Sequence, residues 1–202
     1  MDITDKTGIH VEGHIKIWSP ETNEVFVNKR NAIHYEHMSI ALANSLANSG
    51  NGFVYKMAFG NGGSVVDPTG IITYLRPNSS GANASLYNET YSKVVDDRSS
   101  NNVDPTRNFI EPRHVSGTTY TDVFITCLLD FGEPNDQNAY DNTTNNDGLY
   151  VFDELGLKSY SSTGDELLIT HVIFHPVQKS LNRLIQIDYT VRVHSLSGLA
   201  GA

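Results

Sequence analysis

The chain has 202 residues and a mass of 22.3 kDa; 39% of its residues are hydrophobic, 18% are charged, and the net charge is −9. No apolar run reaches the ~18 residues that cross a bilayer, residues 1–5 lack the features of a secretory signal, and a single cysteine excludes a disulfide framework. The acidic balance, with Lys and Arg scattered along the chain, argues against a nucleic-acid-binding face. The abundance of Ser, Thr, Gly and Asn (19 residues) suits an assembly component better than a metabolic enzyme.

Residues 1–34 are expected to form an N-terminal arm and a β-hairpin. Residues 11–18 alternate between apolar and polar, residues 19–24 have the Pro and Asn chemistry of a turn, and residues 25–27 return as a second strand. The alternation predicts that one face of this hairpin is buried.

A helix is predicted over residues 35–50. Apolar residues recur at spacings of three and four between Tyr35 and Leu46, and Gly50 follows where a helix commonly ends. It is the single long helix that the pattern supports.

Residues 51–75 are expected to form a strand and a glycine-rich turn. Residues 53–59 alternate as a strand and run into the glycines of residues 60–63, and residues 71–75 form a short apolar island. Residues 76–118 are predicted to be a long polar loop, and loops of that length are usually functional or docked on a partner. Within the loop, only residues 86–95 have the pattern of a structured segment.

Residues 119–195 are predicted to be β-rich, and residues 196–202 to be a flexible tail. The strands expected in this half cover residues 121–131, 149–157, 167–176 and 184–193. With seven to nine strands, one long helix and no βαβ rhythm, the predicted fold is a single α+β domain: an antiparallel β-sheet or sandwich with one long helix and long polar loops.

Two histidine pairs raise the question of a metal site. His34 and His37 are three residues apart at the start of the helix, and His171 and His175 are four apart on a strand, where alternation places them on one face. No HExxH motif and no third ligand accompanies either pair. We therefore expect no metal-binding residue, with a polar helix start and an ordinary strand face as the explanations of the two pairs.

Three other features could carry chemistry. Asp153 and Glu154 are adjacent carboxylates, but neighbours on a strand point to opposite faces and so should not share one substrate proton. The glycine-rich residues 60–63 are not followed by a helix start, so a tight reversal or a close backbone approach is expected instead of phosphate binding. Cys127 lies within an apolar strand and is expected to be a buried, unreactive thiol.

Exposed aromatic residues could bind a glycan. Trp18 stands alone, whereas Tyr87, Tyr91 and Tyr120 lie in or beside the loop at residues 76–118. This arrangement keeps a carbohydrate-binding module among the alternatives.

Several stretches resemble virion structural proteins of tailed bacteriophages. The stretches are residues 28–34, residues 55–63 continuing to 67–70 and 72–75, and residues 152–157. The order of helix, strand, glycine-rich turn, Pro, apolar island and Leu-Tyr-Asn-Glu-Thr-Tyr is similar to the N-terminal attachment module of tail-collar fibre proteins. No fibrous region or receptor-binding tip follows, so we expect an adaptor, baseplate, neck or collar subunit and not a fibre shaft.

The resemblance implies a non-enzymatic structural subunit of the virion, assembled in the host cytoplasm. Its expected partners are other phage structural proteins and copies of itself in a homo-oligomer, with no nucleic acid, no membrane and no cofactor. The expected contact segments are residues 1–10, residues 76–118 and the tail from Ser195. The alternatives are a capsid decoration or vertex protein and, in a different class, a small metal-dependent enzyme that uses the paired histidines.

Overall fold

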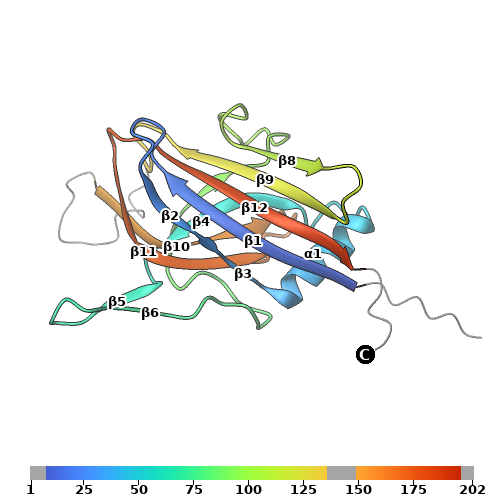
Figure 1. Ribbon diagram of the computed structural model, residues 1–202, viewed down its shortest axis with the longest axis horizontal. Helices are drawn as coiled ribbons and strands as arrows, with labels where there is room; N and C mark the ends of the chain where they lie inside the picture. The colour runs from blue at the N-terminus through green and yellow to red at the C-terminus, as the bar shows by residue number, and fades with distance from the viewer. Residues whose placement is uncertain (1–7, 136–148, 197–202) are drawn as a thin grey trace, which may run out of the picture.

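The chain forms a β-sandwich in the computed structural model, which describes residues 8–135 and 149–196 (Figure 1). One five-stranded antiparallel sheet has the order β2-β1-β12-β9-β8, the other has the order β3-β11-β10-β4-β7, and β5 and β6 form a separate two-stranded sheet. The described residues form twelve strands: β1 (Gly8–Trp18), β2 (Val25–Arg30), β3 (Ala32–Ile33), β4 (Val54–Gly60), β5 (Ser64–Val66), β6 (Ile72–Tyr74), β7 (Glu89–Val94), β8 (Phe109–His114), β9 (Tyr120–Leu129), β10 (Leu149–Ser159), β11 (Thr170–Ser180) and β12 (Ile185–Leu196). The predicted antiparallel β-rich fold with a single helix, α1 (Tyr35–Leu46), is confirmed.

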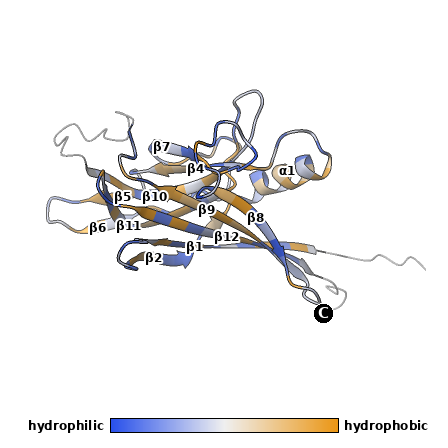
Figure 2. Cartoon of the chain, turned by 90° about the horizontal axis from the view of Figure 1, so that it is seen from above, coloured by the Kyte–Doolittle hydropathy of each residue, from blue (hydrophilic) through white to orange (hydrophobic). Residues whose placement is uncertain are grey.

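In the first sheet, buried and exposed side chains alternate along the strands as the sequence pattern predicts. Ile185, Ile187 and Tyr189 of β12 are 0% exposed and face the second sheet. Ile15 and Ile17 of β1 are buried in the same way. Figure 2 shows hydrophobic colour through the central strands, whereas the end of β2 at the sheet edge is hydrophilic.

Aromatic side chains fill the second sheet's inner face. Phe59, Tyr150 and Phe152 are each 0% exposed. The Tyr150 and Phe152 rings stack with centroids 5.4 Å apart, and Phe152 meets Phe59 edge to face at 5.4 Å. Such pairs contribute about 0.5–1.5 kcal/mol each beyond their buried area. The apolar residues of both sheets and Cys127 belong to one core.

The helix α1 lies at one end of the sandwich and contributes Met38 and Ala41 to the core. It ends at Leu46 and not at residue 50, and the chain then turns through Asn48 and Gly50, whose φ angles are 50° and 75°. Tyr35, predicted on the apolar face, is 75% exposed.

The predicted loop at residues 76–118 is wrong in part, because it contains β7 and β8. β7 falls inside the segment expected to be structured, but β8 was not predicted. β8 is an edge strand with mostly exposed residues, and its Pro112 is tolerated because an edge strand need not donate every N–H. The expected tail and most of the expected N-terminal arm lie outside the described residues, as do residues 136–148.

Candidate functional site

The β5–β6 hairpin projects from the sandwich (Figure 1), and it carries exposed apolar side chains. The exposed fractions are Val65 57%, Val66 59%, Ile71 63%, Tyr74 48% and Leu75 37%. A two-stranded hairpin buries little surface of its own and is marginal in water unless it packs on something. Clustered apolar exposure of this kind marks interaction surfaces.

The tip of the hairpin is held by its own hydrogen bonds. The Asp67 carboxylate accepts from the N–H and hydroxyl of Thr69, at 2.8 and 2.6 Å, and from the N–H of Ile71 at 3.0 Å. The Thr69 hydroxyl and then the Ile71 N–H hold the pKa of Asp67 below its usual value. Gly70 adopts a φ of 86° in this turn, which glycine allows without strain. The tip therefore has a turn geometry that its own side-chain and backbone groups define.

The root of the hairpin is tied to two carboxylates that the sequence had singled out, Asp153 and Glu154. β4 ends at Gly60, opposite Glu154, and the pairing of β10 with β11 shifts register between Phe152 and Glu154. Both carboxylates therefore reach the glycine-rich turn, where they bind different donors, so the expectation that they do not share one proton is not contradicted. Asp153 Oδ1 accepts from the Gly63 N–H at 2.8 Å, and its other oxygen accepts from the Ser64 hydroxyl.

Glu154 is completely buried and binds four donors. Its Oε1 accepts from the N–H groups of Gly62 and Asn88, at 3.1 and 2.8 Å. Its Oε2 accepts from the Tyr87 N–H at 3.0 Å and from His171 Nε2 at 2.9 Å. Burial raises the pKa of this carboxyl, but the hydrogen bonds from His171, Asn88 and Tyr87 outweigh it and hold the pKa below its usual value.

His171 completes this group, which we call the anchor cluster: Asp153, Glu154 and His171. The Asn78 N–H donates to His171 Nδ1 at 2.8 Å, so Nδ1 carries no proton and Nε2 donates to Glu154. The ring is therefore a neutral donor in this arrangement. Asn78 lies between β6 and β7, so the cluster secures the chain on both sides of the hairpin.

Glycine is required at the root because other backbone comes very close. A Cβ atom on Gly60 would lie 2.3 Å from the Asn88 oxygen and 2.5 Å from Glu154 Oε1. On Gly62 it would lie 2.7 Å from the Asn88 nitrogen. The prediction that these glycines permit a close backbone approach is confirmed.

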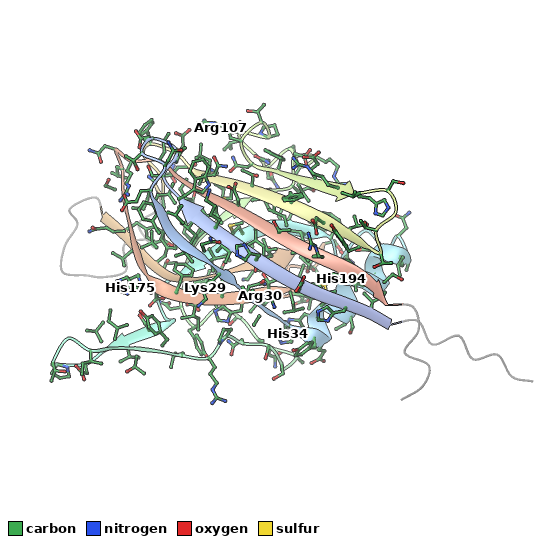
Figure 3. All side chains as sticks on the ribbon, in the orientation of Figure 1. Lys29, Arg30, His34, Arg107, His175 and His194 are labelled. Atoms are coloured by element: carbon green, nitrogen blue, oxygen red, sulfur yellow. The ribbon has the colours of Figure 1, made fainter. Side chains whose placement is uncertain are left out.

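A shallow cavity of about 450 Å³ separates the hairpin root from β2 and β11. Phe26, Lys29, Leu75 and Phe174 are among its lining residues, and the Tyr74 hydroxyl meets His175 Nδ1 at 3.0 Å beside it. Figure 3 labels Lys29 and His175 near this root. His171 and His175 differ in burial: His171 is 0% exposed in the anchor cluster, and His175 is exposed. Both rings contact the chain at or just after the end of β6, His175 at Tyr74 and His171 at Asn78, which agrees with the expectation of a shared face.

The other histidine pair stacks at the start of α1. The rings of His34 and His37 are 3.7 Å apart and nearly parallel. His34 Nδ1 accepts from the His37 N–H at 3.2 Å and caps the helix, whereas the two ring nitrogens of His37 meet the carbonyls of Leu168 and Ala82 at 3.0 Å each. The predicted role of tying down neighbouring chain fits these contacts.

Within residues 8–135 and 149–196, no three His, Cys, Asp or Glu side chains gather in a metal-binding arrangement. Cys127 is 0% exposed, and burial raises the pKa of its thiol to about 12. The predicted unreactive thiol is consistent with this position.

The aromatic residues considered for glycan binding are dispersed and engaged. Trp18 donates through Nε1 to Asp188 at 2.7 Å, and Lys16 covers its ring at 4.5 Å. The Tyr120 ring lies under Arg192 at 4.0 Å, and the Tyr87 hydroxyl donates to the Arg76 carbonyl. No flat platform of neighbouring rings forms among these side chains.

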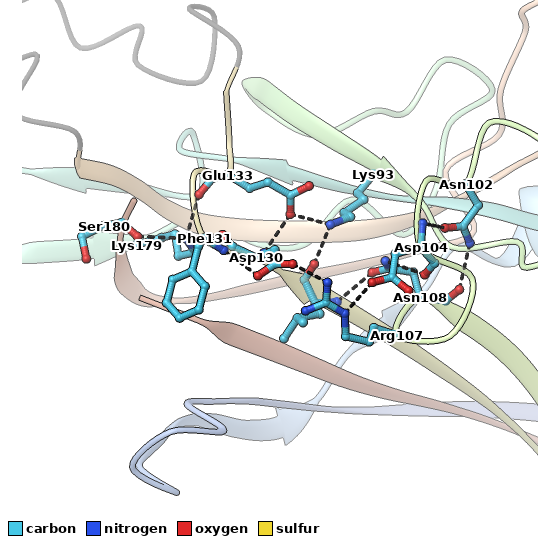
Figure 4. A network of polar contacts seen from close by, with 11 residues as sticks. Lys93, Asn102, Asp104, Arg107, Asn108, Asp130, Phe131, Glu133, Lys179 and Ser180 are labelled. Carbon is cyan, nitrogen blue, oxygen red and sulfur yellow. Dashed lines mark hydrogen bonds and ion pairs between the residues drawn. The ribbon is translucent and has the colours of Figure 1, made fainter. Parts of the chain in front are cut away.

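The sequence reading missed a second buried polar network, shown in Figure 4. Lys179, 0% exposed, donates to the carbonyls of Asp130, Glu133 and Ser180 at 2.7–2.9 Å. Burial lowers its pKa to about 8. Lys93 donates to the Leu128 carbonyl at 2.7 Å and pairs with the Glu133 carboxylate. The available signal was strand parity, because Lys179 shares the parity of buried Val177.

No known protein family, no curated protein and no solved structure matches this chain. In the part of the chain that the structure describes, no helix is long and apolar enough to cross a membrane.

Proposed function

We propose that this chain is a structural subunit of a tailed-bacteriophage particle, of the tail, baseplate or neck and collar, and that it joins its neighbours through the β5–β6 hairpin. The observation that carries the proposal is the exposure of five apolar side chains on a hairpin outside both sheets. A subunit that docks on a partner can bury this surface, whereas an isolated chain leaves it in water.

The anchor cluster explains how such a hairpin could transmit a fixed orientation. Asp153 and Glu154 together bind the N–H groups of Gly62 and Gly63 at its root. Charge-assisted hydrogen bonds to backbone N–H groups are about twice as strong as neutral ones. A rigid root reduces the entropy that docking would otherwise cost.

The resemblance to virion proteins includes this same region. Residues 55–63, 67–70 and 72–75 form β4, the glycine-rich turn and the hairpin, and residues 152–157 include two members of the anchor cluster. The motifs that suggested a phage protein therefore coincide with the proposed docking element.

The test is quantitative mass spectrometry of purified particles produced from the genome that encodes the chain. We expect the chain in the particles at a fixed stoichiometry, and a low multiple of six or twelve copies favours the tail or neck. Hundreds of copies would instead assign it to capsid decoration, and absence from the particles would overturn the proposal.

A metal assay tests the remaining enzymatic alternative on the same protein. Near-stoichiometric zinc, iron or manganese that is lost on His171→Ala would contradict the structural role. The described histidines offer no ready third ligand, so we expect no stoichiometric metal.

A further inference from the structure

A second candidate docking surface lies beside the first half of β1, near α1 and far from the β5–β6 hairpin (Figure 1). A groove of about 550 Å³ separates β1 from the start of the helix. Its apolar lining comes from Ile9, Val11, Ile33, Tyr35, Met38 and Leu42. Ile9 is 63% exposed and Tyr35 is 75% exposed at its mouth.

The groove adjoins an open strand edge. β2 pairs with β1 only from His14 onward, and the Asn31 N–H then donates to the Gly13 carbonyl at 3.2 Å. Beyond this bond the chain leaves the first sheet, because β3 pairs with β11 in the second sheet.

The direction of the backbone groups follows from this bond. Hydrogen-bonding groups of alternate residues point to the same side of a strand, so those of Val11 and Ile9 point the same way as those of Gly13. On that side, no described strand pairs with either residue. An open edge beside an apolar groove is a template for an added strand, in which the backbone supplies affinity and the groove receives alternate side chains.

We propose that residues 1–7 of a second copy of this chain add to this edge as a strand. The segment precedes Gly8, so in each copy it starts next to Ile9, at the groove. Its first four residues alternate in the required way, with Met1 and Ile3 on one parity and Asp2 and Thr4 on the other. The rim of the groove carries Arg30, whose side chain is 83% exposed and lies 3.8 Å from the Glu12 carboxylate. The Arg30 charge is complementary to those of Asp2 and Asp5 in the segment.

A second copy is favoured over the same copy by the length of the segment. Gly8 of β1 already pairs with Leu196, so a return onto its own β1 would use two or more of residues 1–7 for a tight reversal and leave five or fewer to pair with the edge. Exchange between copies needs no such turn, and it closes as a dimer or continues around a ring. The proposal rests on the assembly role above but uses a different surface.

Disulfide trapping between two differently tagged copies tests the exchange. One copy carries Ile3→Cys and the other Tyr35→Cys; native Cys127 is 0% exposed and does not compete. We expect mild oxidation to give a covalent dimer with one copy of each tag. The control acceptor is Val103→Cys, a residue that is 83% exposed elsewhere on the surface.

A dimer yield no greater than that of the Val103→Cys control would overturn the proposal. So would an exclusively intrachain disulfide in the Ile3→Cys/Tyr35→Cys double variant. If particles contain the chain but the cross-link is absent, the exchange is refuted and the proposed function stands. If the cross-link forms but particles lack the chain, the exchange stands and the proposed function is refuted.

A matched pair of variants at Ile9 tests whether the contact is a strand addition. Ile9→Pro and Ile9→Thr both replace isoleucine by a smaller side chain, but only proline removes the N–H on the open edge, a position where edge strands tolerate proline. We expect Ile9→Pro to lower the cross-link yield at least about fivefold relative to Ile9→Thr, as the loss of a main-chain hydrogen bond worth ~1 kcal/mol predicts. Equal yields from two folded variants would contradict strand addition.

Discussion

Glu154 and His171 face each other across β10 and β11, with 2.9 Å between Oε2 and Nε2 and with both side chains 0% exposed. The contact does not stand alone, because Glu154 also accepts three backbone N–H groups from segments on either side of the β5–β6 hairpin. The pair thus joins the core of the second sheet to the element that we propose as the docking surface.

Replacement of Glu154 by glutamine should destabilise the fold by about 2–4 kcal/mol, because an amide NH₂ would face donors from Tyr87 and His171 and leave them unpaired. The measurement is the free energy of unfolding in urea. Glu111→Gln on β8 is the control, since Glu111 pairs with Arg113 at the surface (Glu111 side chain 47% exposed) and should change stability by less than about 0.5 kcal/mol. Equal effects of the two substitutions would contradict the anchoring role.

The Glu154 carboxylate should make the free energy of unfolding depend on pH in the acidic range. Its pKa in the folded chain lies below the usual 4.5, so its stabilisation is present above that value and is lost as the pH falls through the folded pKa. We predict a steeper loss of stability below about pH 4.5 for the native chain than for Glu154→Gln. Urea unfolding at a series of pH values measures this difference, and parallel curves would refute it.

Much of the fold could be predicted from periodicity, but the anchor cluster could not. The alternation of β12 and the spacing in α1 predicted their burial and bounds to within a few residues, because one face of each meets the core. β8 was missed because an edge strand with mostly exposed residues lacks that alternation.

The candidate site depends on contacts between segments far apart in the sequence, and the residue pattern of one segment does not predict such contacts. Asp153 and Glu154 meet the turn at residues 60–63 because β4 ends opposite Glu154 and the β10–β11 register shifts there. The sequence identified these residues separately, together with His171, but offered no signal that they meet. Strand parity placed His171 and His175 on one face, but it gave no sign that only His171 would be buried.

Gly60→Ala should cost about 1–3 kcal/mol in the free energy of unfolding, because its Cβ would meet the Asn88 carbonyl at 2.3 Å and the chain must shift. Gly50→Ala is the comparison: it meets no atom within 4 Å, and its cost of about 1 kcal/mol comes from positive φ alone. Chemical denaturation of both variants at the same pH should show the larger loss of unfolding free energy for Gly60→Ala. The opposite rank would argue against close packing at the root.

His34 should make the fold sensitive to mild acid. Burial, and then the neighbouring His37, lower its pKa below 6.5, so the folded chain holds the neutral ring while the unfolded chain takes up a proton. Stability should therefore be full above pH 6.5 and decline as the pH falls below it. His34→Asn keeps an N-cap acceptor and should flatten this decline between about pH 7.5 and 5.5; His14→Asn, at an exposed position of β1, is the matched control. Thermal unfolding across this range distinguishes the two variants.

The most direct measurement is the copy number, in purified particles, of a chain with Val65→Thr, Val66→Thr and Ile71→Thr. These side chains are 57–63% exposed, so the free energy of unfolding should change little, whereas docking loses its apolar contact. Val103→Thr, 83% exposed elsewhere, is the matched control. The account predicts that the triple variant folds but is at least about tenfold depleted from particles, while Val103→Thr is incorporated normally. Incorporation of the folded triple variant at the native copy number would contradict the account.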